Sequence, residues 1–396
     1  MVTGAAAPQI PDFASETNMR TKATDLLGID LPIFAFSHCR DVVAAVTNAG
    51  GCGVLGAVAH SPEQLDIDLN WIEDEVGGKP YGVDLLVPEK FVGSDEGGLD
   101  RDALDALLPA EHKAFVDDIL ARYDVPPAPD DISLGRGVGG MRVDPKSMEP
   151  LLDACFAHRP ALLASALGPP PAHFLERAHG AGIPVAALAG SVEHARRHAE
   201  AGADLVVAQG TEAGGHTGLI ATMVLVPEVV DAVAPIPVLA AGGIARGRQL
   251  AAGLALGADG VWCGSVWLTT EEAETLPEVK EKFLRAGPGD TVRSRSMTGK
   301  PARMLRTAWT DEWERADGPD PLPMPIQPLL VGPALQRINR GATTPGSGAN
   351  QLATYFVGQV VGTMNTVKST RRVVLEMIEE FIDAVQRLDT LVHAEP

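Results

Sequence analysis

Eight short apolar runs recur along the chain, and a stretch of helical periodicity follows each of them. The runs are 33–36, 53–55, 81–87, 161–165, 184–188, 204–208, 237–241 and 260–263. Strands that alternate with helices in this way form parallel sheets, and eight such units close into a barrel. The sequence therefore predicts an α/β protein built on a (β/α)₈ (TIM) barrel.

An internal repeat supports this fold. The segment PVAALAG at 184–190, followed by GADLVVA at 202–208, is echoed by PVLAAGG at 237–243 and GADGVWC at 257–263. The intervals from the proline to the Gly-Ala-Asp triplet, 18 and 20 residues, fit one strand, one helix of about three turns and a glycine at the helix end. A doubly wound sheet stays open as an alternative, although no GxGxxG motif follows the first strand.

The helix expected over 61–76 can be predicted in detail. Ser61 is expected to cap it, Pro62 to occupy its first turn, and Gln64 to complete a capping box. Gly77 then ends the helix. The apolar side chains expected to face the sheet are Leu65, Leu69, Ile72 and Val76.

Two regions break the strand and helix rhythm. One mixes acidic runs with PPAPDD and GRGVGG, and the other is first basic and then proline-rich. The expected parts are an N-terminal arm (1–20), the barrel (21–275) with an insertion after strand 3 (89–160), a smaller substrate-side domain after strand 8 (276–350), and C-terminal helices that pack on the barrel (351–396). The last helix is expected from about Ser369 to Leu391.

Charge and cysteine usage narrow the functional class. A formal charge of −20 repels nucleic acid and anionic membranes, so neither is an expected partner. Four cysteines without a CxxC pair favour reduced thiols in the cytoplasm and no metal site. The chain shows neither the pattern of a secretion signal nor an 18-residue apolar stretch free of charge and proline, so we do not expect it to span a membrane.

Two glycine turns follow the last two predicted strands. Gly242 and Gly243 come after strand 7, and Gly264 and Ser265 come after strand 8. A glycine pair alone usually marks a tight turn. Because barrels bind phosphate at the loops after these two strands, the position favours a phosphorylated ligand.

The segment after strand 6, QGTEAGGHTG at 209–218, places His216 among four glycines. A histidine on so flexible a backbone is poorly explained as core packing. In a barrel loop it can act as an acid, a base or a charge stabiliser toward a substrate. Other histidines are assigned to structure or surface: His158, His173, His179, His194 and His198.

The run QGTEAGGHTG, together with AAGGI and GADGVWCGSVWLTTEEAE at barrel spacing, resembles the nitronate monooxygenase (2-nitropropane dioxygenase-like) family. The resemblance covers most of 25–310 and continues weakly through GKPARMLRT and YFVGQ, with the insertion outside it. It implies a barrel that holds FMN non-covalently and oxidises alkyl nitronates with O₂, with no nicotinamide requirement. It also implies that His216 is catalytic and that the FMN-binding residues are Ala35, Phe36, Asp84, Gln209, Gly214, Gly215, Gly242, Gly243, Gly264 and Ser265, of which the last four hold the phosphate.

Two departures from the family pattern concern the flavin side. The family usually has Ala-Pro-Met after strand 1, where this chain continues from Ala35 as AFSHCR. Asp84 replaces the usual asparagine, and a carboxylate there would disfavour a neighbouring anion unless it is protonated or paired. His38 and Arg40 could form a second polar cluster at this end, or Arg40 could simply begin the next helix on its solvated side.

These observations favour an FMN-dependent nitronate monooxygenase with a small-molecule substrate and O₂ as partners, and a possible homodimer. A second enzyme hypothesis keeps FMN but makes the chain an NAD(P)H-dependent reductase of quinones or enoyl thioesters. The third hypothesis, of a different class, is a non-catalytic ligand-binding barrel, because a fold does not by itself imply a function.

Overall fold

The computed structural model describes residues 19–85, 106–127 and 145–393. Eight parallel strands close into a barrel in the order β1-β2-β3-β4-β5-β6-β8-β9. Their bounds are Ile33–Ser37 (β1), Cys52–Gly56 (β2), Gly82–Asp84 (β3), Leu162–Ser165 (β4), Val185–Ala189 (β5), Leu205–Gln209 (β6), Val238–Ala241 (β8) and Gly260–Cys263 (β9). Every predicted strand is present, which confirms the barrel and excludes the doubly wound sheet.

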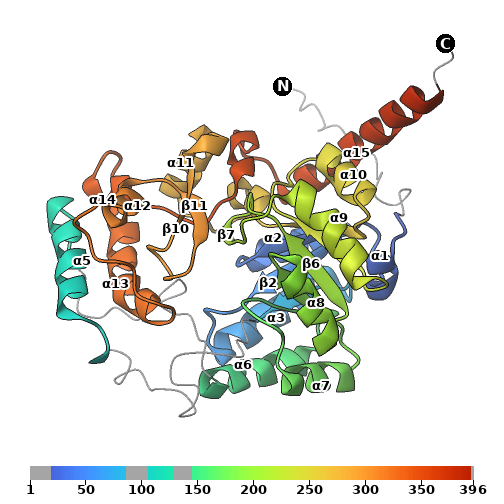
Figure 1. Cartoon of the computed structure of the whole chain (residues 1–396), viewed down its shortest axis with the longest axis horizontal. Helices are drawn as coiled ribbons and strands as arrows, with labels where there is room; N and C mark the ends of the chain where they lie inside the picture. The colour runs from blue at the N-terminus through green and yellow to red at the C-terminus, as the bar shows by residue number, and fades with distance from the viewer. Residues whose placement is uncertain (1–18, 86–105, 128–144, 394–396) are drawn as a thin grey trace, which may run out of the picture.

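Helices cover the outside of the barrel between successive strands (Figure 1). They are Arg40–Asn48 (α2), Pro62–Val76 (α3), Pro145–His158 (α6), Ala172–Gly180 (α7), Val192–Ala201 (α8), Thr222–Val233 (α9) and Gly247–Ala255 (α10), with Lys22–Leu27 (α1) before β1 and the 3₁₀ helix Ser265–Thr269 (η4) after β9. Helix α6 lies within the predicted insertion, yet it packs against α3 in this outer layer.

Side chains on each strand alternate between the lumen of the barrel and the outer helices. On β3, Val83 joins the buried cluster that contains Leu65 and Leu69 of α3. The lumen holds a separate cluster, in which the rings of Phe34 and Trp262 stack with centroids 6.3 Å apart. This alternation is the period of two that a strand imposes, and it decides which residues at each strand end face a ligand in the mouth.

Helix α3 begins as predicted, but its capping box is absent. The Ser61 hydroxyl accepts a hydrogen bond from the Gln64 amide at 3.1 Å. The Gln64 side chain instead donates to Asp68 at 3.0 Å. Asp68 is only 1% exposed and also binds Arg40 and His60, because a buried carboxylate needs several donors. The predicted apolar face of α3 is buried in full.

A smaller unit lies beside the barrel, on the left in Figure 1. Its centre is an antiparallel sheet in the order β10-β11-β7, formed by Thr291–Ser294, Ala302–Leu305 and Gly215–His216. Its helices are Pro277–Arg285 (α11), Pro288–Asp290 (η5), Ala308–Trp313 (α12), Ile326–Gly341 (α13), Gly348–Leu352 (α14) and Gln359–Thr363 (η6).

Helix α5 (Ala110–Arg122) also belongs to the predicted insertion, and it packs on α13 of the smaller unit. The Arg122 guanidinium forms two 2.7 Å hydrogen bonds to the Glu312 carboxylate of α12. The described parts of the insertion therefore join two different layers. The domain boundaries given above stay a prediction, and much of the insertion lies outside the described residues.

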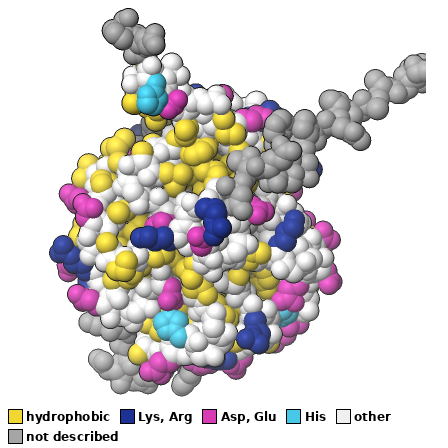
Figure 2. All heavy atoms as spheres, turned by 90° about the vertical axis from the view of Figure 1, so that its right-hand side faces the viewer, with side chains coloured by type: hydrophobic (Ala, Val, Ile, Leu, Met, Phe, Trp, Pro, Cys, Tyr) yellow, Lys and Arg dark blue, Asp and Glu magenta, His cyan; other side chains and the backbone are white. Residues whose placement is uncertain are grey.

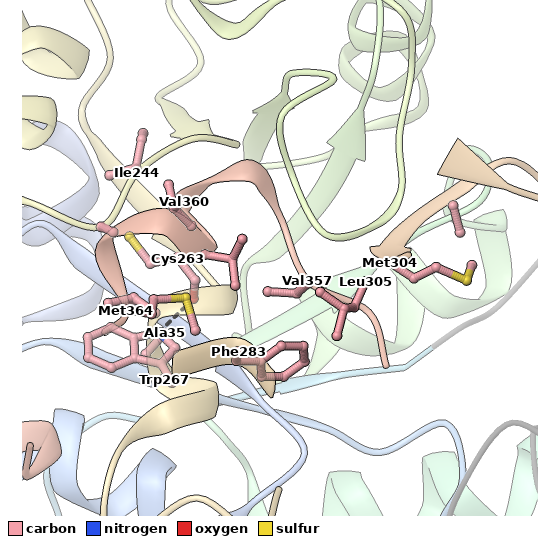
Figure 3. Packing of buried hydrophobic residues seen from close by; sticks show 14 of the residues in the cluster. Ala35, Ile244, Cys263, Trp267, Phe283, Met304, Leu305, Val357, Val360 and Met364 are labelled. Atoms are coloured by element: carbon pink, nitrogen blue, oxygen red, sulfur yellow. Dashed lines mark hydrogen bonds between the residues drawn. The ribbon is translucent and has the colours of Figure 1, made fainter. Parts of the chain in front are cut away.

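Apolar side chains fasten the C-terminal third of the chain to the barrel (Figure 3). Val360 lies in η6 and Met364 follows its last residue. Both belong to one buried cluster with Ala35 and Cys263 of the barrel strands. The Trp267 indole donates to the Cys263 carbonyl at 2.7 Å within this cluster. All four cysteines are buried and free.

The last helix, α15 (Thr370–His393), packs along α10, and its outer end extends past the barrel at the upper right of Figure 1. Arg246 and the Gly247 amide both bind the Glu380 carboxylate. On the face drawn in Figure 2, Lys and Arg side chains are interspersed with acidic and apolar ones. Among the described residues, no helix has the length and apolarity needed to cross a membrane.

Gly247→Ala should loosen the contact between α10 and α15. A Cβ at Gly247 would overlap the carbonyl oxygen of Met377 and the amide nitrogen of Phe381, which are backbone atoms that cannot yield. Overpacking of this kind costs about 1–3 kcal/mol of unfolding free energy, measurable by urea denaturation. Gly180→Ala is the matched control, because a Cβ there meets open space in a helix. Equal stability of the two variants would contradict the expectation.

Candidate functional site

The loops after β6 and β8 touch at the carboxyl end of the barrel. A Cβ added to Gly242 would lie 2.9 Å from the Gly210 carbonyl oxygen and 3.2 Å from the Ala213 nitrogen. One added to Gly243 would lie 3.4 Å from the Glu212 side chain. The histidine-bearing loop and the first glycine turn are therefore neighbours at one rim.

Gly242, Gly243, Gly264 and Ser265 form what we call the glycine cradle. Gly242 and Gly243 have φ angles of +92° and +72°, which a residue with a Cβ rarely adopts. Among the described residues, none accepts a hydrogen bond from the N–H groups of Gly242, Gly243 or Gly264. Free backbone donors at two consecutive strand ends fit an anion such as a phosphate.

The segment around Gly358 connects the cradle to the histidine loop. The Gly358 amide donates to the Ser265 hydroxyl at 2.8 Å, and the Gln359 amide donates to the Glu212 carbonyl at 2.9 Å. The Ser265 hydroxyl keeps its own proton to donate. Gly358 and Gln359 form the end of the YFVGQ run, for which the sequence predicted no role at the site. The glycine in this run was the signal that could have indicated a close backbone approach.

His216 does not lie on a free loop, which corrects the expectation of a flexible, uncovered backbone. It forms the short strand β7 with Gly215 and pairs with Ala302 of β11. Its Nε2 lies 2.8 Å from the Thr298 hydroxyl. Among the described residues, none hydrogen-bonds the other ring nitrogen, Nδ1, which is left for a ligand.

Burial, and to a smaller extent the positive charge of Lys300, together lower the pKa of His216 to about 4. His216 keeps some surface accessible to water, but neighbouring atoms enclose its ring. The imidazole is therefore neutral at pH 7. A neutral ring can accept a proton or hydrogen-bond an anion, but it does not itself carry a positive charge.

Two arginines of the small sheet hold the histidine loop from behind. Arg303 donates to the Thr211 carbonyl and Arg293 to the Thr217 carbonyl, each at 2.9 Å. Both lie on the opposite face of the sheet from His216, because Arg303 pairs with Gly215 while Ala302 pairs with His216. The basic stretch of the sequence had been given no such function.

The other predicted site residues divide into those that face the mouth and those that do not. Phe36 points into the lumen, with its ring stacked on Trp262 and within 3.9 Å of a Cβ placed on Gly264. Gln209 ends β6 on the lumen side. Ala35 packs outward in the cluster with Cys263, so only its backbone could reach a ligand.

Gly214 contacts the Gly358 segment closely, and Gly215 carries a φ of +75° in β7. Both lie in the histidine loop, so their positions fit the site. Their predicted contact with FMN stays a prediction.

Asp84 ends β3 and is 8% exposed. Burial raises the pKa of this carboxyl to about 7. The predicted cluster of His38 with Arg40 does not form. The His38 Nδ1 lies 2.8 Å from the Gly56 carbonyl, whereas Arg40 begins α2 and turns to Asp68 at 3.1 Å.

A cavity of about 310 Å³ lies between α10, η6 and α15. Its charged lining groups are paired with one another, Arg246 with Glu380 and Lys368 with Glu376. It shares no residue with the glycine cradle, so the chemistry argued below does not involve it.

A closed (β/α)₈ barrel whose rim carries backbone donors for an anion, next to a loop that bears a neutral histidine, is typical of a barrel enzyme that binds an anionic ligand. Residues 20–380 match the family model described as nitronate monooxygenase. The chain belongs to the nitronate monooxygenase family and is an oxidoreductase of that family. This confirms the family resemblance seen in the sequence.

Relatives and solved structures agree with this family. The chain is 65% identical to the Mycobacterium tuberculosis protein named "Putative monooxygenase Rv1533", over 94% of this chain and all of that protein. It is 32% identical to the "Probable nitronate monooxygenase" of Staphylococcus saprophyticus, over 79% of this chain and 86% of that one. The structure of nitroalkane oxidase from Streptomyces ansochromogenes superposes with a TM-score of 0.74 at 27% identity, covering 92% of this chain and 99% of that chain.

A titration of the His216 ring checks the electrostatics of the site. In ¹⁵N-imidazole NMR, the resonance missing from a His216→Gln variant should have its midpoint near pH 4 in the parent protein. Because the folded pKa lies below the unfolded value of about 6.5, the unfolded chain binds more protons between these values. The stabilising contribution is therefore present above pH 6.5 and is lost as the pH falls toward 4.

Lys300→Met should raise this midpoint, because it removes one of the two causes of the low pKa. The midpoint should stay below 6.5, because the ring stays buried. Lys22→Met, far from the histidine loop, is the matched control and should leave it unchanged. A midpoint near 6.5 in the parent protein would show that the ring is open to water.

Proposed function

We propose that this protein is an FMN-dependent nitronate monooxygenase, which oxidises small alkyl nitronates with O₂. The observation that carries the proposal is the contact, at one rim, between the glycine cradle and the loop that bears a neutral His216. The family to which the chain belongs and its similarity to a nitroalkane oxidase support the reaction class. A cytoplasmic location and a homodimer stay predictions from the sequence.

The free N–H groups of the cradle fit the phosphate of FMN. A phosphate monoester carries a charge near −2 at neutral pH, and backbone donors at contact distance outweigh the diffuse charge of −20 on the protein. Glu212 lies close to Gly243, but its carboxylate is turned to the Thr222 amide and hydroxyl. Phe36, Gln209 and Asp84 would border the ring system. When bound, the flavin supplies the electron transfer from the substrate and the reaction with O₂.

The Thr298 hydroxyl orients His216 for its part in the reaction. This hydroxyl lies 3.2 Å from the Lys300 carbonyl, to which it can donate its only proton. Its oxygen then accepts a hydrogen bond from Nε2–H of His216, which leaves the lone pair on Nδ1. Nδ1 is thereby a base that can take the α-proton of a neutral nitroalkane, or in protonated form steady the nitronate anion.

An NAD(P)H-dependent reductase of quinones or enoyl thioesters is the second candidate. The altered segment after β1 supports this candidate. So does the similarity to FabK from Thermotoga maritima, whose structure has a TM-score of 0.70 at 27% identity, covering 94% of this chain and all of that one. Anaerobic stopped-flow mixing decides between them. Rapid bleaching of the yellow protein by NADPH supports the reductase, and inertness to NADPH with O₂-dependent turnover of a nitronate supports the monooxygenase. Folded protein that binds no flavin would favour the non-catalytic barrel.

His216→Ala should retain the flavin absorbance but lower turnover by about 10²-fold or more, the usual scale for a positioned proton-transfer group. Turnover is measured as O₂ consumption with a nitronate on enzyme of matched flavin content. His179→Ala is the matched control, because His179 bonds Asp204 on the outside of the barrel. If both variants turn over like the parent, His216 has no part in the reaction.

Gly243→Asp should lose FMN, because a carboxylate would face the phosphate in the cradle. Gly243→Asn introduces the same strain at a φ of +72° without the charge. We expect the asparagine variant to weaken FMN binding less than the aspartate variant by at least about tenfold in Kd, measured by quenching of FMN fluorescence. Equal affinities of the two variants would place the phosphate elsewhere.

A further inference from the structure

Asp84 presents its carboxyl to the lumen at the rim of the barrel. Its neighbours Val83 and Leu85 both lie in the cluster formed with the outer helices. Because side chains alternate along a strand, the side chain between them points into the barrel. As the last residue of β3, it stands at the carboxyl end, where the proposed flavin would bind.

This carboxyl is nine-tenths buried, and no positively charged side chain of the described residues pairs with it. Among the described residues, none donates a hydrogen bond to it or forms an ion pair with it. Its register partners are Gly56 on β2 and Ala164 on β4, neither of which has a polar side chain. A buried carboxylate without such partners is costly, so the neutral form is favoured.

Among the described residues, one titratable group, His38, faces Asp84 from the neighbouring elements. The His38 ring covers the lumen side of Gly56, since a Cβ there would lie 2.7 Å from the ring. Phe36 covers the same position from β1, and the lumen-facing Gln209 and Trp262 carry no charge. On β4 no charged side chain faces it. An experiment must therefore distinguish a proton taken up by Asp84 from one taken up by His38.

We propose that Asp84 holds the flavin in its protonated form, so that FMN binding by this chain is coupled to the uptake of one proton at this carboxyl. The inference rests on the proposed FMN site and deepens it. A protonated carboxyl is both a hydrogen-bond donor and an acceptor, whereas a carboxylate only accepts. The asparagine that the family resemblance gives as usual at this position is neutral at every pH.

The direction of the pH dependence follows from linkage. In the free protein the pKa of Asp84 is about 7. A planar ring system over the mouth excludes the remaining water and receives the proton in a hydrogen bond, which raises the pKa of the bound form. Between the two pKa values the complex holds a proton that the free protein has lost. The contribution of Asp84 to FMN affinity is therefore constant below pH 7 and falls above it, by up to about tenfold per pH unit.

The test compares the parent protein with Asp84→Asn, both freed of flavin, and measures Kd for FMN by fluorescence quenching at pH 7, 8 and 9. FMN phosphate is a dianion throughout this range, so its own titration does not contribute. The parent Kd should rise by about tenfold between pH 8 and 9, while that of Asp84→Asn should change by less than about twofold.

Calorimetry gives a second readout that needs no variant. FMN binding at pH 8, measured in two buffers of different ionisation enthalpy, should take up close to one proton in the parent protein. Asp84→Asn should take up none. If Asp84→Asn does not fold, absence of proton uptake by the parent protein at pH 8 still overturns the inference.

Two control variants locate the proton. Asp41→Asn removes a carboxyl at the same rim that is open to water, and it should keep the parent's pH dependence. His38→Gln should keep it as well. Loss of the dependence in His38→Gln, or its retention in Asp84→Asn, overturns the inference. Failure of every variant and of the parent to bind FMN at any pH would instead overturn the proposed function.

Discussion

Antiparallel pairing between β7 and β11 is the interaction on which the site depends. It takes a glycine-rich segment that could adopt many conformations and fixes His216 opposite Ala302. The same pairing brings Thr298 within hydrogen-bond distance of the ring and sets Arg303 against the loop backbone. The pairing thus fixes the proposed catalytic histidine with the precision of a strand, and the smaller unit supplies the strand against which it is held.

Burial rather than charge pairing sets the protonation states in the mouth. The same cause, exclusion of water, lowers the pKa of His216 and raises that of Asp84 to about 7, so the histidine is neutral at pH 7 and the carboxyl is only partly ionised there. The donors for an anion are backbone amides, which do not titrate. A chain with a large excess of acidic residues can in this way offer a neutral pocket to an anionic ligand.

The fold was predictable because its signal is long. Eight apolar runs, each followed by a helical stretch, leave few topologies, and every run overlaps a strand of the barrel. The place of the glycine turns was predictable once the strands were assigned, because it depends only on which strand each turn follows. The position of His216 near them was also expected, although the roles of these residues stay predictions.

What the sequence did not predict depends on contacts between distant segments. A two-residue strand such as β7 has no alternation to detect, and its partner lies more than 80 residues away. The Gln64 side chain binds Asp68 and does not complete the expected capping box, and Asp68 is itself buried in an ion pair with Arg40 from the preceding helix. Helices α5 and α6 were assigned to one insertion because neither follows an evident strand, and only packing shows that they join different layers.

The contact between α15 and Gly247 has a consequence for how the chain is made. On a ribosome, all eight barrel strands are synthesised before the helix that covers the start of α10. Until α15 has been synthesised, the Gly247 amide lacks its Glu380 acceptor and the surface that α15 buries is open to water. A nascent chain that already has its complete barrel sequence therefore still exposes the surface around α10. A premature stop before Thr370 would leave a product with this surface exposed, which chaperones and proteases recognise.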